Sequence, residues 1–129
     1  MDQRPYAIAA DPARKLVTMS FDPVFWHKGV SSNFIQDCIT AIASLECHSG
    51  EHVILVDLRQ AVLQGQEVYN QMLGLMSSAT ARRIALVAAG PLTRMQTKRL
   101  QVRDNIVMFG DMAEATDWLF KPDSVTKAA

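Results

Sequence analysis

The chain has 129 residues, and its 13 basic and 13 acidic side chains give a formal net charge of zero. This balance excludes a general attraction to nucleic acid or to an anionic membrane surface. No apolar run approaches the roughly 20 residues that span a bilayer, and nothing resembles a signal peptide, so we expect a cytoplasmic protein. We also expect a single domain over residues 1–120 and a frayed tail over residues 121–129.

The first third of the chain predicts an antiparallel hairpin followed by a helix. Strand-like runs over residues 6–10 and 15–21 flank a proline-containing turn at residues 11–14. Asp22-Pro23 ends the second strand, and residues 24–30 are expected to form a loop. Ser31 or Ser32 is then expected to cap a helix over residues 32–47, whose apolar residues recur at three- and four-residue intervals.

Three short apolar runs in the second half predict buried parallel strands. The runs are His52–Leu58, Arg83–Gly90 and Asn105–Gly110, and they lack the polar alternation of a strand that faces water. Amphipathic stretches follow them and predict helices over residues 65–78, from Pro91 or Thr93 onward, and after a capping Asp111. The fold class predicted is α/β: a mixed sheet with an N-terminal antiparallel hairpin and then parallel βαβαβα units, about five strands and four helices in all.

The closing segment MFGDMAEATDWL points to a family. Its Phe109, Asp111, Glu114, Ala115, Trp118 and Leu119 look like the F-x-D-x-x-E-A-x-x-W-L ending common in the SpoIIAA-like group, and the order of elements is similar to that of SpoIIAA-like and STAS-like domains. The resemblance implies a non-enzymatic regulatory module that binds protein, of the anti-sigma-factor-antagonist type. STAS domains proper carry an Asp-Ser-x-Gly-like turn whose serine is phosphorylated. The corresponding residues here, 62–67, read VLQGQE and contain no serine.

The candidate binding residues lie where parallel strands end, because ligands of open α/β sheets bind at that edge. Phe25 and Trp26 either fold back over the sheet and first helix or contact a partner or ligand, with His27 as a polar tip. Gln64, Gly65 and Gln66 lie at the start of the second helix, and the glutamines offer amides to a bound group. The candidate partner- or ligand-binding residues are therefore Phe25, Trp26, His27, Gln64, Gly65 and Gln66.

Two functions from different classes remain open. The first is binding of a protein, including a second copy of this chain in a homodimer. The alternative is binding or sensing of an apolar small molecule or lipid between the sheet and the second helix. Met72 and Met76 on that helix suit either core packing or an adaptable groove.

No catalytic residue, metal or cofactor is expected, so we do not expect an enzyme. Cys47, His48, Glu51 and His52 are all zinc-ligating types, but they straddle a Ser-Gly turn that removes the one-face geometry of a helical pair. Cys38 lies on the apolar stripe of the first helix, where its thiol would be inert. Cys38 and Cys47 are expected in one helix about 13 Å apart, too far for a disulfide.

A basic cluster accompanies the third helix. It consists of Arg94, Lys98, Arg99 and Arg103, with Arg82 and Arg83 before the adjoining strand. The cluster is explained either by a solvated helix face or by contact with an acidic protein surface or a phosphate-bearing ligand. Nucleic acid is not expected, because aromatic residues do not interleave with the basic ones.

Overall fold

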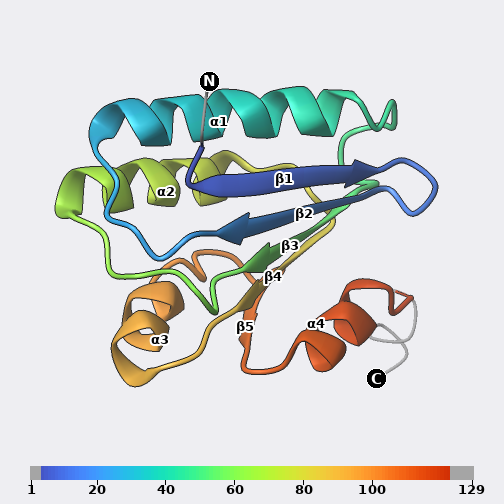
Figure 1. Cartoon of the computed structure of the whole chain (residues 1–129). Coiled ribbons are helices and arrows are strands. Elements are labelled where there is room, and N and C mark those ends of the chain that lie inside the picture. Colours follow the sequence, from blue (N-terminus) through green and yellow to red (C-terminus); the bar gives the residue numbers. More distant parts are fainter. Residues whose placement is uncertain (1–3, 123–129) are drawn as a thin grey trace.

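Residues 4–122 are described by the computed structural model, and within them five strands form one mixed sheet (Figure 1). The strands lie in chain order: β1 (Tyr6–Asp11), β2 (Leu16–Phe21), β3 (Val53–Asp57), β4 (Arg83–Val87) and β5 (Ile106–Phe109). β1 is antiparallel to β2, and every other neighbouring pair is parallel. The predicted sheet is confirmed. Residues 123–129 of the predicted tail lie outside the described residues.

Helices cover both faces of the sheet, which explains the unbroken apolar runs. They are α1 (Lys28–Ala43), α2 (Gln66–Ser78), α3 (Pro91–Lys98) and α4 (Met112–Leu119). Figure 1 shows α1 and α2 on one side of the sheet and α4 on the other. All of β4 and the first four residues of β3 are buried between these layers. No helix within residues 4–122 is long and apolar enough to cross a membrane.

Two apolar cores result, one on each face. The larger packs α1 and α2 on the sheet and includes Met19, Phe34 and Ile84, each at most 2% exposed. The smaller packs α4 through Ala115 and Leu119. As predicted, Asp111 caps α4, because its carboxylate accepts a hydrogen bond from the Glu114 amide at 3.2 Å.

The predicted cap at Ser31 or Ser32 is wrong, and α1 starts four residues before the predicted first residue, 32. The helix begins at Lys28, because the imidazole Nδ1 of His27 accepts the Gly29 amide at 3.1 Å and caps the first turn. Ser31 is fully buried inside the helix, and its hydroxyl donates to the Lys28 carbonyl at 2.9 Å. A serine that bonds back to the preceding turn cannot serve as a cap.

The predicted end of α1 at Cys47 is also wrong, since the helix ends at Ala43. Glu46 adopts a left-handed φ of 53° and turns the chain away before Cys47. Both cysteines are free, and only Cys38 lies in the helix. Cys38 is 1% exposed, so its predicted burial is confirmed, and this burial raises the pKa of the thiol to about 12.

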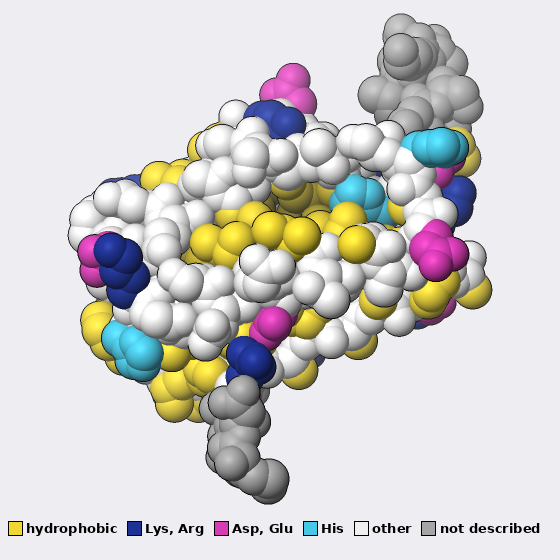
Figure 2. Space-filling view, turned by 90° about the horizontal axis from the view of Figure 1, so that it is seen from above, with side chains coloured by type: hydrophobic (Ala, Val, Ile, Leu, Met, Phe, Trp, Pro, Cys, Tyr) yellow, Lys and Arg dark blue, Asp and Glu magenta, His cyan; other side chains and the backbone are white. Residues whose placement is uncertain are grey.

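An open apolar groove of about 660 Å³ runs between α1 and α2. Figure 2 looks down on this side and shows hydrophobic side chains in a hollow at its centre. Ile39 lines the groove and is 53% exposed, although its position beside the apolar stripe suggested burial. At this point α2 leaves one flank of the α1 stripe uncovered.

His52 is expected to make the protein sensitive to mild acid. It is 2% exposed, its Nε2 atom has no hydrogen-bond partner within residues 4–122, and burial lowers its pKa. The unfolded chain therefore takes up a proton near pH 6.5 that the folded chain takes up only at lower pH. The free energy of unfolding should fall as pH drops below about 6.5, by at most about 1.4 kcal/mol per pH unit.

Urea unfolding between pH 7.5 and 5 tests this expectation. His52→Gln should flatten the slope, whereas His48→Gln, at an exposed position, should keep it. The lowered pKa values of Glu51 and Asp57 act in a separate range, below about pH 4.5. If the free energy of unfolding depends on pH equally steeply in His52→Gln and in the wild type, His52 is not the source of the acid sensitivity.

Candidate functional site

Three segments meet at the carboxyl edge of the sheet, and Gln64 joins them. They are residues 22–27 after β2, residues 58–65 after β3, and α3 after β4. The Gln64 Oε1 atom accepts the Trp26 amide at 2.7 Å, and its Nε2 atom donates to the Val24 carbonyl at 3.1 Å. The Gln96 side chain forms two 3.2 Å hydrogen bonds to the amide and carbonyl of Gln64. Gln64 therefore fixes the relative positions of all three segments.

The two neighbouring aromatic residues at this edge point in different directions. Trp26 is 4% exposed and packs into the larger core, so it folds back over the sheet and first helix. Phe25 is 70% exposed and lies over the start of α2, where Gly65 is the cap residue. A Cβ on Gly65 would lie 3.2 Å from Phe25 Cζ, so glycine permits the ring to lie this close.

Exposed large apolar side chains gather on these three segments. Within residues 4–122, only Ile39, Val102 and Phe120 are exposed residues of this kind elsewhere. We call the set the apolar edge; its members are Val24, Phe25, Val62, Leu63, Leu92 and Met95. Met95 and Leu100 are the strong apolar residues in the sequence around α3, which favours both as anchors to the core. Leu100 packs against the core as this pattern predicts, whereas Met95 is 59% exposed and the buried Thr97 faces the core.

The remaining predicted site residues lie outside this arrangement. His27 is used as the cap of α1. The Gln66 amide donates to Asn70 Oδ1 at 2.8 Å, one turn further along the exposed side of α2. The structure thus brings together Phe25, Trp26, Gln64 and Gly65, whereas the side chains of His27 and Gln66 bond within the first turns of α1 and α2. A role of His27 and Gln66 in binding stays a prediction.

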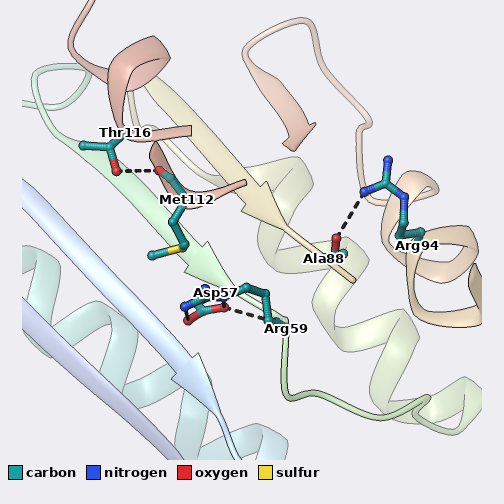
Figure 3. Close-up of polar contacts among 6 residues, drawn as sticks. All are labelled: Asp57, Arg59, Ala88, Arg94, Met112 and Thr116. Atoms are coloured by element: carbon teal, nitrogen blue, oxygen red, sulfur yellow. Dashed lines mark hydrogen bonds and ion pairs between the residues drawn. The ribbon is translucent and has the colours of Figure 1, made fainter. Parts of the chain in front are cut away.

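The polar side chains drawn near the ends of β3 and β4 are paired with one another or with backbone carbonyls (Figure 3). Asp57 accepts two hydrogen bonds of 2.9 Å from Arg59, and this pairing lowers the pKa of the carboxyl. Arg94 lies over Gly110 and donates to the Ala88 carbonyl at 3.1 Å. Within residues 4–122, no group of three or more His, Cys, Asp or Glu side chains is placed to hold a metal ion.

The predicted basic cluster does not form one face. Arg83 is 8% exposed, donates to the Trp118 carbonyl and stacks on the Trp118 ring at 5.2 Å. Arg82 donates to the Leu119 carbonyl at 2.8 Å, and Arg103 donates to the Ala79 carbonyl. These arginines hold helix ends in place, because exposed carbonyls at a helix C-terminus attract cations. Lys98 at the end of α3 and Arg99, the C-cap residue of that helix, are exposed, as is Arg103.

A small cavity lies directly beneath the apolar edge. Its volume is about 80 Å³, and it is bounded by the sheet, α2, α3 and the loop that contains Gln64. Apolar residues dominate its wall; they include Met19, Trp26, Phe34, Val68, Met72 and Met76. Gln96 and Tyr69 also line it, and neither was predicted, since nothing in their spacing marks them. Tyr69 on α2 and Gln96 on α3 reach the same cavity only because of how the two helices are placed in the fold.

The Gln64 contacts predict a local loss when the amide is removed. Gln64→Met keeps the length of the side chain but cannot accept from the Trp26 amide. We expect hydrogen exchange of that amide to accelerate and the free energy of unfolding to fall by about 1–2 kcal/mol. Gln66→Met removes an exposed amide and should cost less than about 0.5 kcal/mol. Equal exchange rates at Trp26 in wild type and Gln64→Met would show that Gln64 does not hold this segment.

Two solved structures share this arrangement of strands and helices. An uncharacterised protein of the DUF3478 family with a SpoIIAA-like fold, from Shewanella loihica, is 18% identical over 92% of this chain and 97% of its own, with a TM-score of 0.67. An anti-sigma factor antagonist from Mycobacterium paratuberculosis is 12% identical over 90% of this chain and 95% of its own, with a TM-score of 0.65. The class is therefore an α/β domain with a SpoIIAA-like fold, and the predicted resemblance is confirmed at the level of fold.

Comparison by sequence gives no match. No protein-family model matches the chain, and the search of curated proteins finds no significant match. Function therefore has to be argued from the site itself.

Proposed function

We propose that this protein is a non-enzymatic regulatory module that binds another protein through its apolar edge. The apolar edge carries this proposal, because six large apolar side chains are exposed on the three segments that follow the carboxyl ends of β2, β3 and β4. Exposed apolar groups that gather in this way mark interaction surfaces, whereas single ones do not. Phe25 is the expected anchor, since aromatic residues dominate interface energetics.

The solved neighbour from Mycobacterium paratuberculosis, an anti-sigma factor antagonist, supports a regulatory role in protein binding. In this chain α2 starts after Gly65 without a side-chain cap, and residues 62–67 contain no hydroxyl group. We therefore propose that binding here does not depend on phosphorylation at the start of α2. The two free cysteines fit the cytoplasm as the place of action.

Sedimentation velocity tests whether the partner is a second copy of the chain. If it is, the wild type should dimerise, and Phe25→Ser combined with Leu92→Ser should give monomers with an unchanged melting temperature. Ile39→Ser is the matched control, because Ile39 is exposed on the groove between α1 and α2. A dimer that survives in the double variant but is lost in Ile39→Ser would place the interface on the groove and contradict this surface.

The second candidate function is binding of an apolar small molecule, and the cavity beneath the apolar edge favours it. The cavity lies between the sheet and α2, beside Met72 and Met76. Its volume of about 80 Å³ compares with about 150 Å³ for a cavity that binds benzene. This size supports a ligand of a few heavy atoms rather than a lipid.

A further inference from the structure

Tyr69 is a buried residue on the wall of the cavity, and its side-chain hydroxyl makes no hydrogen bond within residues 4–122. The residue is 9% exposed. Leaving a buried hydroxyl unpaired costs about 1–3 kcal/mol, and most buried polar groups in proteins are paired. Burial also raises the pKa of Tyr69, so the hydroxyl stays protonated and can donate.

The rest of the wall defines what Tyr69 could donate to. Val56, Val68 and Leu86 give it an apolar body, while Thr93, Gln96 and Thr97 place further polar groups on the side formed by α3. Asp22, an exposed residue, is the charged member of the lining, and it would repel an anion. The occupant that fits is small, mainly apolar and not anionic.

We propose that the cavity binds a small uncharged molecule with an apolar body and one hydrogen-bond acceptor, such as a short-chain ketone, and that the Tyr69 hydroxyl donates to this acceptor. The inference rests on the second candidate function and gives that ligand its chemical class. Trp26 and Gln64 line the same cavity, so an occupant would contact the residues that position the apolar edge. Binding would be weak, because a ligand of about five heavy atoms gains little free energy in total.

Two probes of equal shape test the acceptor. Butanone carries a carbonyl oxygen, and 2-methyl-1-butene replaces it by an apolar methylene group. We expect butanone to shift the methyl NMR signals of Met72 and Met76 with saturation in the millimolar range, and to bind about tenfold more tightly than the alkene. The methyl group of Met112, on the α4 side of the sheet, should not respond.

Tyr69→Phe removes only the unpaired hydroxyl, so this variant should fold, and it should bind both probes within about twofold of each other. If the two probes bind the wild type equally, the role of Tyr69 is refuted while an apolar site remains. If neither probe shifts the signals at 50 mM, both the inference and the second candidate function are refuted. Neither result affects protein binding at the apolar edge, which the sedimentation experiment tests separately.

Discussion

Replacement of Trp26 by alanine should lower the free energy of unfolding by about 3–5 kcal/mol, the range found when a buried large aromatic residue is truncated. The Trp26 ring is 4% exposed and lies 5.5 Å from the ring of Tyr6, 5.7 Å from that of Phe21 and 5.4 Å from that of Phe34. These tilted contacts join β1, β2 and α1 at one point of the core. Removal of the ring also enlarges the cavity beneath the apolar edge.

Phe25→Ala is the matched control for this prediction, since the two aromatic residues are adjacent in the sequence. Phe25 is 70% exposed, so its truncation should change the free energy of unfolding by less than about 1 kcal/mol. Chemical denaturation of both variants measures the difference. Similar losses in the two variants would mean that Trp26 is not the core residue described here, and Trp26→Ala would then be a usable probe of the surface.

Replacement of Arg83 by alanine should cost about 2–4 kcal/mol. Arg83 is buried at the start of β4, donates to the Trp118 carbonyl at the end of α4, and lies 5.2 Å from the centre of the Trp118 ring. A hydrogen bond from a charged donor contributes about 1.5–3 kcal/mol, and a desolvated cation–π contact adds up to about 2 kcal/mol. Because α4 is the helix of the smaller core, its detachment would expose that face of the sheet.

Lys98→Ala provides the control for Arg83, because it removes a cation that is exposed on α3. Its effect should stay within about 0.5 kcal/mol. Arg83→Lys should recover only part of the loss, since an ammonium group lacks the planar surface that stacks on the indole. Thermal unfolding followed by near-ultraviolet circular dichroism measures the loss, since its signal includes Trp118 together with Trp26. No loss of stability in Arg83→Ala would refute this account of how α4 is held.

The sheet could be predicted because each strand is marked by a sequence pattern within a few neighbouring residues. The apolar runs around β3 and β4 are long enough to show burial on both faces, and Asp111 with Glu114 marks the start of α4 within four residues. The start of α1 was not predictable in this way. His27 is an uncommon cap, and Ser31 looks like a good one until its burial against the neighbouring helix is known.

The candidate site was predictable in part. The carboxyl-edge rule located Gln64 and Gly65, but the sequence does not reveal which of two adjacent rings, Phe25 or Trp26, enters the core. The same rule places residues 90–93, at the start of α3, at this edge. It does not reveal that Leu92 is exposed or that Gln96 bonds to the Gln64 backbone, because both depend on tertiary structure.

Site-specific photocrosslinking tests the central claim most directly, because it traps a protein partner of any sequence at a chosen position. A benzophenone side chain placed at position 25 or at position 39 samples two exposed apolar surfaces, the apolar edge and the groove between α1 and α2. In cells that make the protein, irradiation should give a discrete protein adduct from position 25 and none from position 39. Adducts from position 39 alone, or from neither position, would contradict the proposal that the apolar edge binds a protein.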